Sequence, residues 1–371
     1  MDFEYSDDQL ELRAAARSVL TSACPPSVVR SVVEGGEAKE LWPTLVGLDW
    51  PALGLPEAHG GLGLGFLEVG IIVEELGRVV APSPFLATVT QFVPVVRESP
   101  VGVALLEQVA AGRVTGSLAL AEGGRWEPEA VQFSAERVGD HWVLRGRKSH
   151  VLDARSADEL VVVARGAGGL GAFLVPGAAA EASRPAVLDP TLPVATVAFD
   201  GVEVGDDRVL FAPGDTRFPA VLRGAIEEAT VALALSTVAT CRAIFEATLQ
   251  YAKDREQFGR PIGAFQAVKH RLAECYLAVE RADSLATFAA LTIAEDDDRR
   301  AVATAMAKAA AGECQRLLVR DGLQLHGGIG FTWEHDLHFH LKRAITGDLL
   351  FGNAATQRAR LAGLLGLEAM A

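Results

Sequence analysis

Residues 254–271, DREQFGRPIGAFQAVKHR, separate two long apolar patterns and determine how the second half of the chain is interpreted. Gly259 and Pro261 interrupt the first pattern, and from Phe265 onward apolar residues again recur at three- and four-residue spacing. The stretch therefore predicts a turn between two helices.

This turn carries side chains suited to gripping a nucleotide-like ligand. Arg255 offers a guanidinium fork, Gln257 an amide that donates and accepts, and Phe258 a flat ring for stacking. The alternative is a charged loop between helices in which Phe258 is buried. Other parts of the sequence are needed to choose between a ligand-binding turn and a charged loop.

Helical periodicity covers nearly all of the chain beyond residue 213. We expect helices over residues 218–254, 264–296, 299–323, 336–346 and 352–365. Long helices joined by short turns pack as antiparallel bundles. The pattern predicts a C-terminal α-helical bundle domain over residues 213–371.

An alternating apolar pattern replaces the helical one near Gly116. It predicts strands over residues 117–121, 130–138, 142–151, 159–164, 172–175 and 194–199. These indicate a small antiparallel β-barrel or sandwich, a central domain over residues 116–212. Residues 1–115 form a predicted N-terminal α-helical domain, with Ser6 capping its first helix. The expected fold class is α+β, with helical, β and helical domains in that order.

Two other motifs suggest binding sites that we do not expect. Residues 166–171, GAGGLG, have the spacing of a dinucleotide fingerprint, but a strand follows them and no helix N-terminus is available for a pyrophosphate. His335, His338 and His340 suggest zinc, yet they lack the acidic general base of a zinc-protease pattern. We therefore predict a hairpin at the first motif and no metal at the second.

Composition excludes several classes of function. The chain has 371 residues, of which 50% are hydrophobic, and a net charge of −14, which disfavours nucleic acid or an anionic membrane as its partner. Its N-terminal sequence, MDFEYSDDQLELR, lacks the apolar core of a signal peptide. The short apolar run over residues 229–241 suits a buried helix. A cytoplasmic location is expected, because the cysteines are widely spaced and predicted to be buried thiols: Cys24, Cys241, Cys275 and Cys314.

A second informative stretch is DGLQLHGGIGFTWEHDLHFHLKR, residues 321–343. Gly327, Gly328 and Gly330 leave backbone N–H groups open to a phosphate, and Gln324 adds a donor just before them. A helix stop accounts for one glycine. It does not account for three.

With these stretches the chain resembles the acyl-CoA dehydrogenase family. The resemblance also includes LPEAHGGLGLG and EELGR in the N-terminal helices and the helical, β, helical order. It implies a flavin, FAD, that lies between subunits. It also implies that one set of residues reaches the adenosine and pyrophosphate end of the neighbouring subunit's flavin: Arg255, Gln257, Phe258, Gln324, Gly327 and Gly328.

The family chemistry is α,β-dehydrogenation of an acyl-CoA thioester, which needs a carboxylate to take the α proton. The resemblance places this glutamate in a YEG-like segment, where LFGNAATQR here has Phe351. A second family position for the base falls on Ala229, one residue after Glu228. A one-residue shift turns a helical side chain by about 100°. Glu228 is therefore a weak substitute, and Glu227 and Glu228 are expected to form a solvated or capping acidic pair.

The β domain departs from the family as well. LAEGGRWEP stands where a TEPxxGS-like strand end is common, and His150, Val151 and Leu152 replace the family's WIT beside the flavin ring. The expected hydroxyl and aromatic ring are missing there. Flavin contacts from this chain's own β domain are therefore not expected.

This combination is similar to the non-catalytic subunit of heteromeric actinobacterial acyl-CoA dehydrogenases of the steroid type. It implies FAD shared across the subunit interface, a paralogous partner in an α2β2 heterotetramer, an acyl-CoA substrate and an electron-transfer acceptor. One alternative is a self-sufficient homotetrameric dehydrogenase that uses Glu228. Another is a structural or regulatory acyl-CoA-binding subunit without flavin contacts. Other flavin reactions on the same fold also stay open.

Overall fold

The computed structural model describes residues 4–183 and 185–367, which form two compact units. The helical unit is drawn from Met1–Ala38, Phe66–Pro82 and Thr230–Ala371. The sheet unit is drawn from Lys39–Gly65 and Ser83–Ala229. The α+β fold class is confirmed. The predicted domain limits of 1–115, 116–212 and 213–371 stay a prediction.

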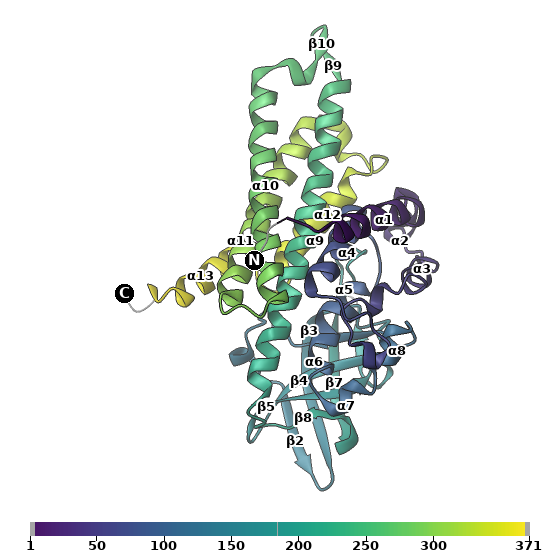
Figure 1. Ribbon diagram of the computed structural model, residues 1–371, viewed down its shortest axis with the longest axis vertical. Coiled ribbons are helices and arrows are strands. Elements are labelled where there is room, and N and C mark those ends of the chain that lie inside the picture. The colour runs from purple at the N-terminus through teal and green to yellow at the C-terminus, as the bar shows by residue number, and fades with distance from the viewer. Residues whose placement is uncertain (1–3, 184, 368–371) are drawn as a thin grey trace. The chain divides into compact units, whose positions relative to one another are not determined.

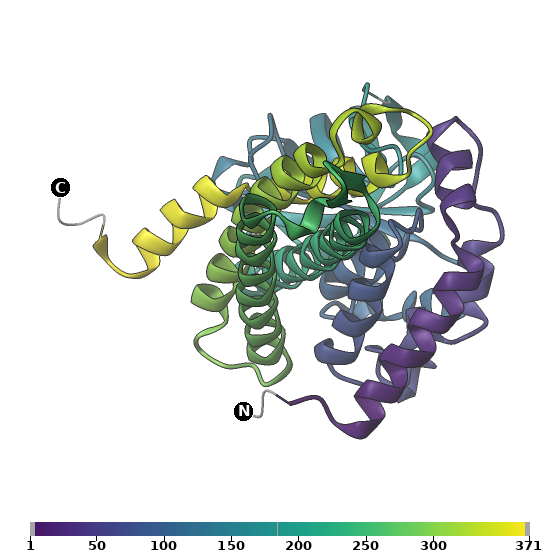
Figure 2. The same ribbon diagram turned by 90° about the horizontal axis from the view of Figure 1, so that it is seen from above.

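The helical unit is built around long helices that lie side by side (Figures 1 and 2). Helix α9, Phe218–Asp254, begins in the sheet unit and contributes most of its length here. The remaining helices are α1 (Asp7–Ala23), α2 (Pro26–Val33), α4 (Phe66–Arg78), α10 (Gln266–Ala294), α11 (Arg300–His326), α12 (Leu337–Leu349) and α13 (Ala354–Leu364). The predicted C-terminal helices are therefore confirmed, with ends shifted by a few residues.

Helix α1 begins at the capping residue that the sequence predicts. The Ser6 hydroxyl accepts the Gln9 N–H at 3.3 Å, and the Gln9 side chain accepts the Ser6 N–H at 2.9 Å. This reciprocal pair is a capping box, and it confirms the predicted start of α1.

Close packing of α4 on α9 depends on a glycine. A Cβ atom at Gly77 would lie 2.5 Å from the Ser236 carbonyl oxygen, and the Thr240 hydroxyl donates to the Gly77 carbonyl at 2.9 Å. Any side chain at Gly77 would force the two helices apart.

The sheet unit contains a sheet in the order β6-β7-β3-β2-β4-β5-β8, with β1 paired to β4. Most pairs are antiparallel as predicted, but β1–β4 and β2–β4 are parallel. The strands are β1 (Gly116–Ala119), β2 (Ser134–Val138), β3 (His141–Leu152), β4 (Glu159–Gly166), β5 (Gly169–Pro176), β6 (Glu181–Ser183), β7 (Val194–Gly205) and β8 (Val209–Phe211). The three-residue strands β6 and β8 were not predicted, because three residues are too few to show an alternating pattern.

Short helices precede the strands or connect them along the chain. They are α3 (Leu41–Val46), α5 (Phe85–Ala87), α6 (Val93–Val96), α7 (Pro100–Val103), α8 (Leu106–Ala110), the 3-10 turns η1 (Trp50–Ala52), η2 (Glu57–His59), η4 (Pro128–Ala130), η5 (Gly177–Ala179) and η6 (Asp206–Arg208), and the π-helical η3 (Thr88–Phe92). The GAGGLG segment lies at the β4–β5 turn, where Gly166 pairs with Gly169. The prediction of a hairpin there is confirmed.

Helix α9 is the one described helix whose length and composition would allow it to cross a membrane. Of its most apolar 18-residue window, 78% is buried inside the structure. Core helices of globular proteins share this property, as predicted for residues 229–241.

Candidate functional site

A tight β-hairpin joins α9 to α10 and presents Phe258 at its tip. Strands β9 (Glu256–Gln257) and β10 (Arg260–Pro261) pair antiparallel, and Phe258 and Gly259 between them have φ angles of +56° and +75°. These are the positive angles of a type I′ turn. The Phe258 side chain is 92% exposed, so the alternative of a buried Phe258 is wrong.

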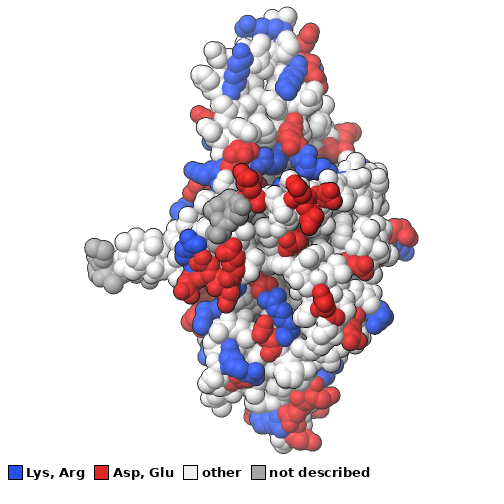
Figure 3. All heavy atoms as spheres, viewed as in Figure 1, with Lys and Arg blue, Asp and Glu red and all other residues white. Residues whose placement is uncertain are grey.

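Polar groups at the base of this hairpin are open to solvent. The Arg255 backbone N–H donates to the Tyr251 carbonyl at 2.8 Å, and the Arg255 carbonyl accepts the Ile262 N–H at 2.8 Å. Arg255 is exposed, and its guanidinium has no partner among the described residues. The exposed Gln257 amide donates only to the neighbouring Glu256 carbonyl, at 2.7 Å. Basic side chains gather at this end of the helical unit, with acidic ones beside them (Figures 1 and 3).

The glycine-rich stretch forms a single 3-10 turn, η8 (Gly327–Phe331), directly after α11. Gly327 has a φ angle of +61°, and its N–H donates back to the carbonyls of α11, which ends the helix. Space is open around both glycines, because a Cβ atom at Gly327 or Gly328 would meet nothing within 4 Å. Gln324 is exposed one helical turn earlier. An anionic group could approach this backbone closely.

Ring stacking connects the two segments. The Tyr251 ring, one helical turn before Arg255, stacks on the ring of His326, the last residue of α11. Their centroids are 4.5 Å apart at an interplanar angle of 20°. Sequence reasoning did not identify this pair. No local signal indicates the pair, because the packing of two separate helices creates it.

The family position of the base is an apolar, firmly held turn. Phe351 is 7% exposed and has a φ angle of +55°, followed by Gly352 at +85°. The Gln357 amide donates to the Phe351 carbonyl at 2.7 Å. The turn geometry is therefore fixed by the backbone, and its side chain cannot accept a proton.

Glu228 is buried and ion-paired. Arg97 donates to both oxygens of its carboxylate, from Nη1 at 3.2 Å and from Nη2 at 2.5 Å. The ion pair with Glu228 raises the pKa of the Arg97 guanidinium against the opposing effect of burial. Glu227 and Glu228 are each 5% exposed, so the expectation of a solvated or capping pair is wrong. Arg97, far away in sequence, makes burial of Glu228 possible.

Near the end of β3 the exposed His150 side chain lies beside Trp126, which belongs to the segment between β1 and β2. His150 has a φ angle of +53°, and its ring lies 5.5 Å from that of Trp126, centroid to centroid. Below them Lys148 is fully buried and donates to Glu122 at 2.6 Å and to the Leu120 carbonyl at 3.1 Å. Burial lowers the pKa of this amine to about 8. The Lys148–Glu122 pair joins β3 to the segment that follows β1.

The histidines beyond η8 serve packing. His338 stacks on Trp333 with centroids 4.8 Å apart, and His340 donates to the Arg78 carbonyl at 3.1 Å. His335 accepts the Leu337 N–H at 3.1 Å. In the part of the chain that the structure describes, no group of three or more His, Cys, Asp or Glu side chains could hold a metal ion.

Models of two protein-family domains match the sequence. Residues 6–98 match the N-terminal domain of acyl-CoA dehydrogenase, and residues 219–365 match the C-terminal domain. The chain belongs to the acyl-CoA dehydrogenase family. It is accordingly placed among flavoprotein oxidoreductases that use FAD.

Several relatives match most of the chain. Acyl-CoA dehydrogenase IpdE2 of Mycobacterium tuberculosis is 29% identical over 343 residues, 91% of either chain. The 3-sulfinopropanoyl-CoA desulfinase of Paraburkholderia xenovorans is 28% identical over 381 residues, 98% of this chain and 97% of that protein.

Solved structures agree over nearly the full length. The ChsE4-ChsE5 complex from Mycobacterium tuberculosis matches with a TM-score of 0.90 at 25% identity and covers 99% of each chain. A variant of the Tcur3481-Tcur3483 steroid ACAD matches with a TM-score of 0.88 at 31% identity, covering 98% of this chain and 99% of that one.

The exposed groups on the two segments suit the adenosine and diphosphate end of an acyl-CoA dehydrogenase flavin. A free guanidinium and open glycine backbone match a diphosphate, and an exposed aromatic ring matches a planar base. At the end of β3 the residues His150, Val151 and Leu152 carry no hydroxyl, and the hydroxyl of the preceding Ser149 donates to the Ala121 carbonyl at 3.4 Å.

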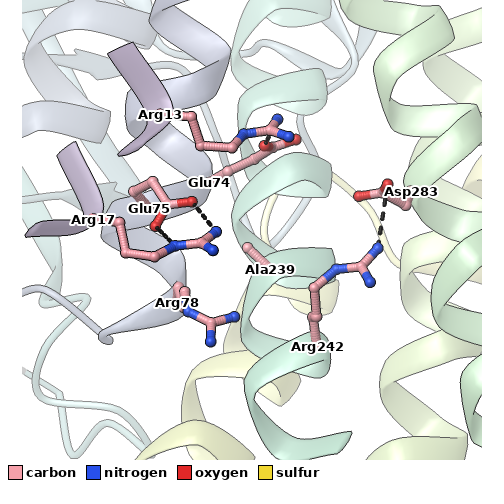
Figure 4. Close-up of a pocket in the computed structure, with 8 residues that line it drawn as sticks. All are labelled: Arg13, Arg17, Glu74, Glu75, Arg78, Ala239, Arg242 and Asp283. Atoms are coloured by element: carbon pink, nitrogen blue, oxygen red, sulfur yellow. Dashed lines mark hydrogen bonds and ion pairs between the residues drawn. The ribbon is translucent and has the colours of Figure 1, made fainter. Parts of the chain in front are cut away.

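A charged cavity of about 210 Å³ lies elsewhere in the helical unit, where α1, α4, α9 and α10 meet (Figure 4). The EELGR motif contributes Glu74, Glu75 and Arg78 to it. Glu74 pairs with Arg13 at 2.6 Å, and Glu75 receives two hydrogen bonds from Arg17. Burial nevertheless raises the pKa of Glu74 to about 7. Each of the four arginines that line the cavity is ion-paired with a carboxylate, so we interpret the cluster as structural.

Proposed function

We propose that this chain is the non-catalytic subunit of a heteromeric, FAD-dependent acyl-CoA dehydrogenase. Its partner would be a paralogous subunit that carries the glutamate base, in an α2β2 assembly. This chain would contribute contacts to the adenosine and diphosphate end of the partner's flavin through Arg255, Gln257, Phe258, Gln324, Gly327 and Gly328. The flavin, when bound, accepts the hydride from the β carbon of the acyl chain.

The observation that carries the proposal is the exposure of Phe258. A phenylalanine that is 92% exposed at positive φ loses the benefit of burial and strains its backbone. Arg255 beside it has no partner in the described chain. A stacking ring and an unpaired guanidinium on a rigid hairpin are explained by a ligand or partner outside the chain.

The residues at the two positions where the resemblance places a base support the same assignment. Phe351 occupies the family position, and the carboxylate of Glu228 has both oxygens bonded to Arg97. A base must face the substrate, whereas the Glu228 carboxylate is 5% exposed and held against the Arg97 guanidinium. The self-sufficient dehydrogenase is therefore the weaker alternative.

The comparisons support the kind of partner and substrate. Two of the matching structures are two-protein complexes, and one of them is described as a steroid ACAD. We infer an acyl-CoA substrate with a bulky, steroid-type acyl group and reoxidation of the flavin by an electron-transfer acceptor. The chain would work in the cytoplasm, consistent with its buried free thiols.

Expression alone and with the partner tests the proposal. The lone chain should contain little flavin and have no dehydrogenase activity, whereas the co-expressed complex should contain one flavin for each pair of chains. Dehydrogenation and full flavin occupancy by the lone chain would refute it. A structural or regulatory subunit without flavin contacts predicts instead that Arg255→Ala leaves flavin retention by the complex unchanged.

A further inference from the structure

The half-buried Tyr251 and the buried His326 connect the two segments that face outward. His326 is 3% exposed, and its Nδ1–H donates to the Gly322 carbonyl at 2.8 Å. That bond fixes the imidazole plane against which the Tyr251 ring lies, 4.5 Å away and nearly parallel. The orientation of one ring therefore determines the position of the other.

On one side, this stack fixes the hairpin. The Tyr251 carbonyl accepts the Arg255 N–H, and the Arg255 carbonyl accepts the Ile262 N–H, each at 2.8 Å. Arg255 is thus tied by its own backbone to the residue that carries the stacked ring. A shift of Tyr251 would move the start of the β9–β10 hairpin.

On the other side, the stack fixes the glycine turn. His326 immediately precedes Gly327, and a Cβ atom at Gly330 would lie 3.0 Å from the His326 Cβ. The His335 ring packs edge-on against His326, with centroids 5.2 Å apart at 70°. The turn between His326 and His335 is therefore folded closely around the imidazole.

We propose that Tyr251 and His326 are positioning residues that hold Arg255 and the Gly327–Gly328 backbone in one fixed relation for a shared dinucleotide. This inference rests on the proposed function. The two segments come from helix ends more than 70 positions apart in sequence, and the stack joins them directly. Neither ring needs to touch the ligand.

The test measures FAD affinity by titrating the flavin-free complex with FAD and following flavin fluorescence. Tyr251→Ala and His326→Ala should each weaken FAD binding about tenfold. Tyr251→Phe retains the ring and should bind FAD like the unmodified complex. Phe245→Ala is the matched control, because it removes the Phe245–Tyr276 ring pair from the same helix. It should lower the melting temperature without changing FAD affinity.

A double-mutant cycle separates positioning from a general loss of structure. If Tyr251 acts through Arg255, the Tyr251→Ala/Arg255→Ala complex should bind FAD about as weakly as the Arg255→Ala complex. Losses that multiply would overturn the positioning role, as would Tyr251→Ala and His326→Ala effects no larger than that of Phe245→Ala.

The same cycle distinguishes the two proposals. Unchanged FAD affinity in Arg255→Ala would refute the proposed function, and the positioning role with it. Weak binding in Arg255→Ala together with unaffected binding in Tyr251→Ala and His326→Ala would refute the positioning role alone. Size-exclusion chromatography of each variant checks that the complex is assembled before titration.

Discussion

Arg97 donates to both carboxylate oxygens of Glu228, so the acidic side chain nearest to the second family base position is already bonded. The carboxylate is buried, and the guanidinium is about one-third exposed. The pair lies within the sheet unit and joins the end of α6 to the first part of α9. This arrangement predicts a structural effect of mutation rather than a catalytic one.

Arg97→Met should destabilise the chain strongly, because it leaves the Glu228 carboxylate buried without its partner. Breaking such a pair costs about 3–5 kcal/mol. Arg97→Met/Glu228→Met should recover much of the loss, because it removes both charges. Urea denaturation of the three proteins measures these differences. A double variant as unstable as Arg97→Met would contradict the explanation.

Glu228→Gln tests the competing function in the same position. If the partner supplies the base, the complex with Glu228→Gln should turn over acyl-CoA at the unmodified rate and retain its flavin. If Glu228 were the base, turnover would be abolished while the flavin remained bound. A steady-state assay with a flavin absorbance spectrum distinguishes the two results.

Phe258 should affect the free chain and the complex in opposite directions. Phe258→Asn should stabilise the free chain by about 0.5–1 kcal/mol, since asparagine tolerates positive φ and little burial is lost. The same change should lower flavin retention by the complex, because the stacking ring is gone. Thermal unfolding and flavin content give the two readings. Leu277→Asn, at another exposed apolar position, is the control and should leave flavin content unchanged.

The helices could be predicted from sequence because their apolar periodicity is long and their ends carry strong signals. Residues 218–254 were predicted with both ends as the structure has them, and Ser6 caps α1 as expected. The hairpin at Phe258 was predicted only as a turn, because strands of two residues leave no period. The sequence left open whether the Phe258 ring is exposed or buried, because it does not show which residues pack against that ring.

Pairings between distant residues could not be predicted. Nothing local to Glu228 indicates Arg97, and nothing local to Tyr251 indicates His326, because each pair is created by the packing of separate elements. The departure from the family pattern at Phe351 was visible because it depends on residue identity alone. The buried state of Glu228 depended on a tertiary contact, and the prediction for it was wrong.

Glu74 should make stability depend on pH. Its pKa is raised by burial from 4.5 to about 7, against the pull of Arg13 and with added repulsion from Asp283 and Glu75. The folded chain therefore holds this proton more tightly than the unfolded chain. The contribution of Glu74 to stability is greatest below pH 4.5 and is lost as the pH rises through about 7.

Glu74→Gln mimics the protonated carboxyl and should remove this pH dependence. Relative to it, the unmodified chain should lose about 2–3 kcal/mol between pH 5 and pH 8. Urea denaturation of both proteins at the two pH values measures the change. Glu75→Gln is the control: with Glu74 intact, the loss between the two pH values should persist. A constant gap between Glu74→Gln and the unmodified chain would contradict the raised pKa.

Lys308 should be needed for the turn that carries Phe351. Its buried ammonium donates to the Gly347 carbonyl at 2.6 Å and to the Asp348 carbonyl at 2.7 Å, at the end of α12. The Asp348 carboxylate in turn accepts the Ala354 N–H at 3.0 Å and so fixes the start of α13. Lys308→Met leaves two carbonyls without donors, at a cost of about 1–3 kcal/mol each.

The loss in Lys308→Met should be smallest at neutral pH and should grow as the pH rises above 8. Burial lowers the pKa of the Lys308 amine from 10.5 to about 8, so below pH 8 the folded chain holds a charged ammonium on the two carbonyls, at the expense of its hydration. As the pH rises from 8 to 10.5, the unmodified chain should gain stability relative to Lys308→Met, because the amine becomes neutral in the folded state first. Denaturation at pH 7 and pH 10 measures both effects. Equal stability of the two proteins at pH 10 would show that the turn at Phe351 is held by other contacts.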